Sequence, residues 1–145
     1  MPANYYSITK NDLFDLFARL AQMSRIFVPY KHNDKFHFGE FDPSREPAIE
    51  LGGIRQSQPI KSFINPPREK IPNDSPKDKR PLILAGVKGC DLSSLILQDF
   101  VFLKGDTEDP FYAESRNNTI IIGNDCTYAK ETCCCVAMDG APSPQ

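Results

Sequence analysis

The sequence predicts an α/β or α+β fold with a mixed sheet. Two apolar runs of strand length flank a helical segment in the second half of the chain, which is the pattern of a βαβ unit. The first half contains an amphipathic helical pattern and two short strand-like segments. Because 145 residues suffice for one sizeable core, we expect residues 1–145 to form a single domain.

The first 41 residues predict a helix followed by a pair of strands. Apolar residues recur every three or four positions over about residues 12–23, with Asn11 or Asp12 as the expected cap. Residues 25–30 and 35–41 have strand character and are expected to pair antiparallel. The helix should turn one apolar stripe toward the core: Leu13, Phe14, Leu16, Phe17, Leu20 and Met23.

Residues 42–80 predict a long extended loop. They hold most of the prolines of the chain, and the run 68–80 is almost without apolar residues. Within this loop Phe63 and Ile64 precede two prolines, so we expect a stiff segment that lies over the core, with a partner-docking motif as the alternative.

The second half predicts the βαβ unit in detail. Residues 81–87 form a continuous apolar run, and residues 92–103 follow as a helix with Asp91 as its expected cap. This helix has so little polar face that we expect it to be mostly buried. Residues 118–123 predict a second buried strand, parallel to the first and reached by a right-handed crossover.

Composition and charge exclude several classes of protein. Residues 1–90 carry 14 basic and 10 acidic side chains, whereas residues 91–145 carry 3 and 9, so no basic groove for nucleic acid is indicated. No apolar run is long enough to cross a bilayer, and the first residues lack signal-peptide character. We therefore expect a cytoplasmic protein that neither binds nucleic acid nor inserts into a membrane.

All five cysteines lie in the last 56 residues, which indicates metal or redox chemistry. Cys90 and Cys126 each follow a predicted parallel strand by three residues, so both should emerge at the same edge of the sheet. A loop of six residues can return the trio at 133–135 to this edge. If the trio is extended, Cys133 and Cys135 share a face and Cys134 points away.

Four sulfurs are thus expected to converge, those of Cys90, Cys126, Cys133 and Cys135. Four thiolates suit a [4Fe–4S] cluster or a tetrahedral zinc ion, and the spacing favours the cluster because no pair of C-x₂₋₄-C knuckles is present. Because some of the cysteines are adjacent, a thiol redox sensor is a further alternative for the function. The two histidines, His32 and His37, are expected at ordinary surface or half-buried positions.

The amino-acid sequences of several segments resemble those of a known family. Residues 82–91 (LILAGVKGCD), 109–112 (DPFY), 116–125 (RNNTIIIGND) and 126–138 (CTYAKETCCCVAM), with 61–69 (KSFINPPRE) upstream, are similar to β subunits of soluble nickel–iron hydrogenases and sulfhydrogenases. They also resemble the related A subunit of anaerobic sulfite reductase. The resemblance covers roughly residues 61–138. Members of this family usually have an aromatic residue at the position of Cys134, which agrees with its exclusion from the ligand set.

The resemblance implies an iron–sulfur electron-transfer subunit of an anaerobic oxidoreductase complex, with other redox subunits as partners. Residues 81–138 would be the cluster-binding region and residues 139–145 a tail. Family members continue into a ferredoxin-like domain, so we expect either a fragment or a short version that passes electrons to a separate subunit.

No catalytic base and nucleophile are evident in the sequence. Lys88 and Lys130, near the expected ligands, are interpreted as solvated, with support of a reduced cluster as the alternative. The rival from another class is a zinc-stabilised or metal-free interaction scaffold.

Overall fold

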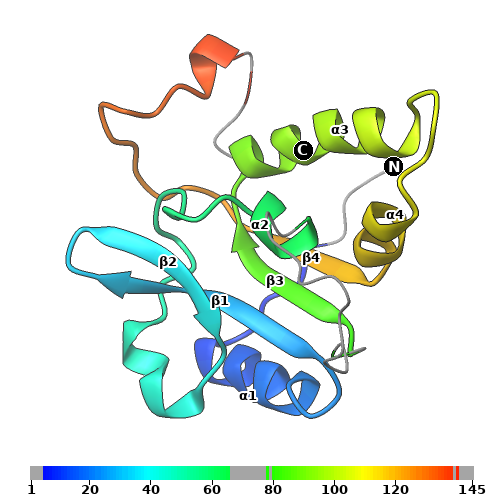
Figure 1. Cartoon of the computed structure of the whole chain (residues 1–145). Coiled ribbons are helices and arrows are strands. Elements are labelled where there is room, and N and C mark those ends of the chain that lie inside the picture. The colour runs from blue at the N-terminus through cyan, green and yellow to red at the C-terminus, as the bar shows by residue number, and fades with distance from the viewer. Residues whose placement is uncertain (1–4, 66–77, 79, 139, 141–145) are drawn as a thin grey trace.

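The computed structural model describes residues 5–65, 78, 80–138 and 140, and its centre is a four-stranded mixed sheet (Figure 1). The strand order is β2-β1-β3-β4. Strands β1 (Arg25–His32) and β2 (Lys35–Glu40) form an antiparallel hairpin. Strand β3 (Leu82–Val87) runs parallel to β1 on one side and to β4 (Thr119–Gly123) on the other. The predicted α/β class, the hairpin and the parallel pair are confirmed.

Helix α1 (Lys10–Leu20) covers one face of the sheet, but its ends differ from the prediction. Thr9 is the cap, because its Oγ1 accepts a hydrogen bond from the Asp12 backbone N–H at 3.1 Å. The helix ends at Leu20, and Met23 is 68% exposed beyond it. The buried stripe is consequently narrower than expected.

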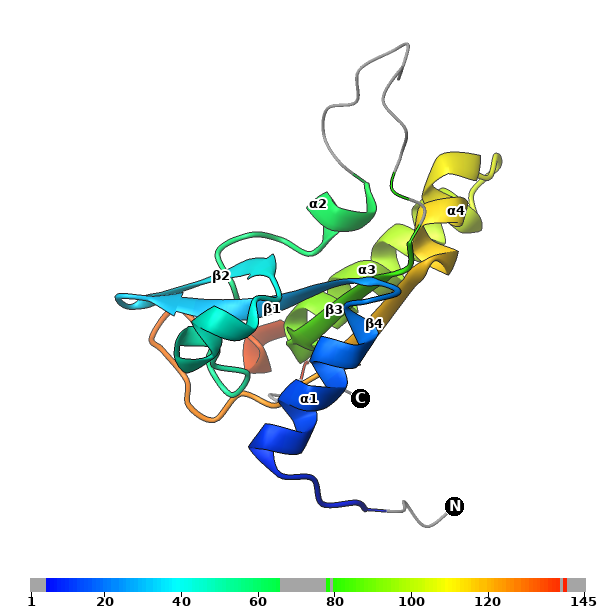
Figure 2. The ribbon, with the colours of Figure 1, turned by 90° about the horizontal axis from the view of Figure 1, so that it is seen from below.

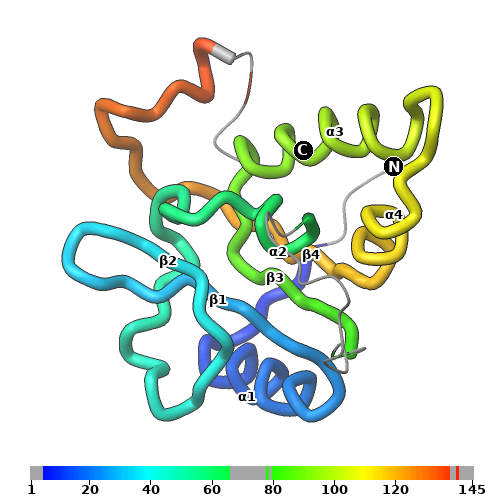
Figure 3. Tube along the Cα trace, in the orientation of Figure 1, coloured from blue at the N-terminus to red at the C-terminus, as the bar shows by residue number. Residues whose placement is uncertain are grey.

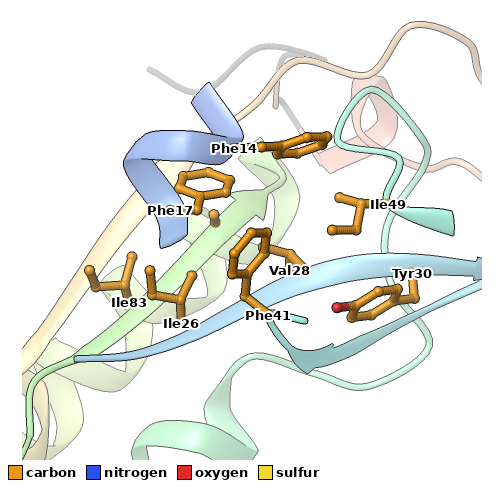
Figure 4. Packing of buried hydrophobic residues seen from close by; sticks show 9 residues of the cluster. Phe14, Phe17, Ile26, Val28, Tyr30, Phe41, Ile49 and Ile83 are labelled. Carbon is orange, nitrogen blue, oxygen red and sulfur yellow. The ribbon is translucent and has the colours of Figure 1, made fainter. Parts of the chain in front are cut away.

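The core on the α1 face is rich in aromatic side chains (Figure 4). Phe17 packs edge-on against Phe41 with ring centroids 5.7 Å apart. Figure 4 shows these rings above aliphatic side chains of β1 and β3. The buried members of this core are Phe14, Phe17, Ile26, Val28, Tyr30, Phe41, Ile49, Ile83 and Ala85.

A second core lies on the opposite face of the sheet, where α2 (Lys61–Ile64), α3 (Gly89–Leu103) and α4 (Pro110–Asn117) pack. Figure 2 shows α1 and α2 on opposite sides of the sheet. The buried residues here are Phe38, Ile60, Ile64, Leu82, Leu84, Val87, Leu95 and Tyr112. No helix in the described part of the chain has the length and apolar character needed to cross a membrane.

The segment predicted as one extended loop contains two short helical turns. These are η1 (Pro43–Ala48), which Asp42 caps, and α2. Within α2, Ile64 is buried and Phe63 packs against the same core, which confirms that this segment lies over the core. Residues 66–77 and 79 of the predicted loop lie outside the described residues.

Helix α3 corrects two predictions. It begins at Gly89, so Asp91 lies inside the first turn and is not the cap, while the N-cap residue Lys88 makes no side-chain capping bond. The helix is also not mostly buried, because Asp91 and Leu95 are its only buried residues. Strand β4, at the edge of the sheet, is likewise largely exposed rather than buried.

Helix α4 was not predicted. Its cap is Asp109, whose Oδ1 accepts hydrogen bonds from the backbone N–H groups of Phe111 at 2.9 Å and Tyr112 at 3.1 Å. Pro110 occupies the first helical turn, where proline is favoured.

Candidate metal centre

The loops that follow β3 and β4 lie side by side at one edge of the sheet. The backbone N–H of Asn124 donates to the Val87 carbonyl at 2.8 Å, and this bond joins the ends of the two strands. Cys90 lies in the first turn of α3, and Cys126 follows the end of β4 by three residues. The parallel strands therefore bring two cysteines 36 positions apart to the same edge, as predicted.

The segment after Cys126 is held to this edge by contacts with the first half of the chain. Thr127 donates to the Gly52 carbonyl from its backbone N–H at 3.0 Å and from its hydroxyl at 2.6 Å. Further along, Lys130 Nζ donates to the Asp34 carbonyl at 3.2 Å, at the tip of the β1–β2 hairpin. Figure 3 shows the orange segment after β4 passing the turquoise segment that follows η1. The cysteine trio thus starts from an anchored loop.

Within this segment, local hydrogen bonds shape the approach to the trio. The Lys130 backbone N–H donates to Cys133 Sγ at 3.2 Å, and the Cys133 N–H donates back to the Lys130 carbonyl at 2.9 Å. Cys133 and Cys134 have no regular secondary structure, and Cys135 precedes a short turn, η2 (Val136–Met138). Figure 1 shows η2, drawn in red, set apart from the N-terminal end of α3.

Burial and nearby charges change the pKa values of two of the predicted ligands, Cys90 and Cys126. The pKa of Cys90 is raised to about 11, mainly by burial and also by the negative charges of Asp91, Cys135 and Cys126. Burial also raises the pKa of Cys126, and negative charge on Cys135 and Cys133 acts in the same direction. The charges of Cys126 and Cys135 therefore act on Cys90, and those of Cys133 and Cys135 act on Cys126. All five cysteines are free thiols.

At this site, the environment of Lys88 differs most from what the sequence predicts. It is not solvated: its relative exposure is 0%. Its Nζ donates to the Leu51 carbonyl at 2.6 Å and to the Asp125 carbonyl at 3.0 Å. Burial lowers the pKa of Lys88, while negative charge on Cys126, Asp125 and Cys90 raises it. Lys88 therefore joins three segments at the cysteine edge and places a buried cation beside the thiols.

Arg55 and Asp91 complete the charged surroundings of Cys90, and sequence reasoning did not identify Arg55. Burial raises the pKa of Asp91 to about 6, and the cation of Arg55 opposes this shift. Arg55 also lowers the pKa of Cys90. Next to Arg55, buried Gln56 donates from Nε2 to the Gly86 carbonyl at 3.2 Å. No motif marks residues 55 and 56, since only the tertiary structure brings this loop to the end of β3.

The donor set fits an iron–sulfur cluster or zinc in its chemistry, because both prefer thiolates. Among residues 5–65, 78, 80–138 and 140, however, no group of three or more His, Cys, Asp or Glu side chains is already arranged to hold a metal ion. The five cysteines, all of which lie among these residues, do not form such a group.

The histidines lie away from this edge. His32 is exposed and His37 is half-buried, which confirms their expected positions. Both line a surface depression at the hairpin tip together with Asn33, Asp34, Lys35, Phe36 and Ser57.

Comparisons with known proteins support the resemblance drawn from the motifs. The chain is 30% identical over 138 residues to "Sulfhydrogenase 2 subunit beta" of Pyrococcus furiosus, in an alignment that covers 87% of this chain. It spans 40% of the length of that relative. No family model matches the chain, and no solved structure matches it. Similarity to a hydrogenase β subunit is thus confirmed, over more of the chain than residues 61–138.

Proposed function

We propose that this chain is an electron-transfer subunit or domain of a multi-subunit oxidoreductase, and that Cys90, Cys126, Cys133 and Cys135 hold a [4Fe–4S] cluster. The proposal is supported by the parallel strands β3 and β4, which bring Cys90 and Cys126 to one sheet edge, and by the similarity of the chain to a sulfhydrogenase β subunit. The cluster, when bound, would supply one-electron transfer.

The residues of the chain would supply the ligands and set the environment. Two thiols come from the start of α3 and from the third residue after β4. The other two come from the irregular segment, which can adapt to the size of the cluster. Lys88 and Arg55 provide positive charge next to thiols that burial keeps protonated. This charge would offset the negative charge of four thiolates and raise the reduction potential of the site.

The proposal extends to the partners and organisation of the protein. A relative named as a β subunit indicates assembly with other redox subunits, to which this domain would pass electrons. Residues 1–145 would act as one domain, because η1 and α2, between the two halves, pack against the same sheet as α1 and α3.

Anaerobic reconstitution with iron and sulfide tests the assignment. We expect about four iron and four sulfide per chain and a brown chromophore. Cys→Ser substitution at position 90, 126, 133 or 135 should abolish both. Cys134→Ser is the matched control within the same trio and should retain both. A single zinc without sulfide, or loss of the cluster only in Cys134→Ser, would contradict the ligand set.

A zinc-stabilised or metal-free interaction scaffold is the second candidate. It is favoured by the exposed apolar surface of α3. Metal and sulfide analysis separates it from the first, since a scaffold would contain one zinc per chain or no metal.

A further inference from the structure

The outer face of α3 is an apolar stripe, formed by Ile96, Leu97, Phe100 and Val101. These side chains are 71%, 67%, 62% and 53% exposed. They are spaced at i, i+1, i+4 and i+5, so they lie on one side of the helix, opposite buried Leu95. In Figure 1, α3 lies at the periphery of the molecule. A solvated helix normally presents polar residues on such a face.

The stripe is symmetric about its own midpoint. Ile96 and Val101 lie equally far from a point between residues 98 and 99, as do Leu97 and Phe100. The next positions on this side of the helix are Ser93 and Lys104, again equally spaced from that point and both exposed. Two copies packed antiparallel would place each apolar residue against another apolar residue, with small or polar residues at both ends.

Charge along the helix favours the same arrangement. The loop after α3 carries exposed Asp106 and Glu108. The opposite end of α3 has the positive end of the helix dipole, and the charge of exposed Arg55 acts on Asp91 in the first turn of α3. In an antiparallel pair the acidic loop of one copy lies at the N-terminal turn of the other, where opposite charges attract. A parallel pair would bring the two acidic loops together.

From this stripe we infer that α3 forms a two-fold symmetric, antiparallel contact with a second copy of this chain. Four large side chains, each more than half exposed, offer roughly 500 Å² per chain, so these residues would contribute at most about 1,000 Å² to the area buried by the pair. This area is at the lower limit for a specific interface, which predicts a weak, concentration-dependent dimer.

Sedimentation velocity of the full chain tests the inference, with reductant present so that disulfides cannot join two copies. We expect the mass to rise from 16.3 kDa toward twice that value between about 1 and about 300 µM. Ile96→Glu should weaken association at least about tenfold. Ile120→Glu is the matched control, because Ile120 is 54% exposed on β4 and lies outside the stripe.

Two results would overturn the inference: a wild-type chain that stays monomeric over this range, or an Ile120→Glu variant that loses association as fully as Ile96→Glu. Asp106→Lys tests the orientation. The antiparallel pair predicts weaker association of this variant, whereas stronger association would mean that the acidic loops face each other.

Discussion

Lys88 gives the sharpest prediction about the cysteine edge. The substitution Lys88→Met keeps most of the volume of the side chain and removes its two hydrogen bonds, to the carbonyls of Leu51 and Asp125. Those carbonyls belong to the segment after η1 and to the loop after β4. We therefore expect the variant to be less stable and the cysteine-bearing loop to be more loosely held.

The magnitude follows from the burial of Lys88. A hydrogen bond from a charged donor contributes about 1.5–3 kcal/mol, so two contribute roughly 3–6 kcal/mol. Part of this is offset in the variant, because methionine avoids the cost of burying an ammonium group, a cost reflected in the lowered pKa of Lys88. We expect a net loss of about 2–4 kcal/mol in the free energy of unfolding.

Urea unfolding of the metal-free protein, with reductant and chelator, measures this loss as a lower midpoint at an unchanged m-value. Lys130→Met is the matched control, because Lys130 is exposed and its Nζ makes one hydrogen bond of 3.2 Å, so its effect should stay below about 0.5 kcal/mol. Equal stability of Lys88→Met and wild type would refute the idea that Lys88 joins these segments.

Three further predictions concern the framework around the site. Asp109→Ala should lower the unfolding free energy by about 1 kcal/mol in urea titrations, because two backbone N–H groups of α4 lose their acceptor, and Asp109→Asn should restore most of it. Gly86→Ala should cost more than about 1 kcal/mol by the same assay, since Gly86 has φ +81° and an added Cβ would lie 2.9 Å from Pro29 Cγ; a neutral result would contradict this backbone conformation. Burial and the hydrogen bond to Asp99 raise the pKa of Tyr112, so its stabilisation is present below the ordinary tyrosine pKa of about 10 and is lost as the pH rises above it. Tyr112→Phe should therefore lose stability less steeply than wild type above about pH 10, and parallel pH profiles would show that Tyr112 does not titrate as described.

Local sequence patterns were sufficient for most of the fold. The apolar run at 81–87 and the segments of strand character at 25–30 and 35–41 each identified a strand, because strand periodicity and β-branched or aromatic content are local properties. The parallel β3–β4 pair followed from the helical segment between two such runs. This topology also predicts that Cys90 and Cys126 lie at one edge of the sheet.

The local sequence patterns gave wrong predictions of burial for two elements. The apolar content of α3 and β4 suggested two buried elements, but a sequence cannot distinguish an apolar face that meets the core of its own chain from one left open. Ile96 and Ile120 are exposed because the sheet ends at β4 and only one side of α3 meets it. Helix α4 was missed because its start depends on the Asp109 cap rather than on an apolar stripe.

The sequence by itself determined which atoms are available for metal chemistry and which two strands present them. Only the tertiary structure decided the electrostatic surroundings of those sulfurs, because Lys88, Arg55 and Gln56 act through contacts with residues about 30 or more positions away. Periodicity is a property of neighbouring residues, whereas the burial of a charge and the pKa of a thiol depend on what the rest of the chain places around them.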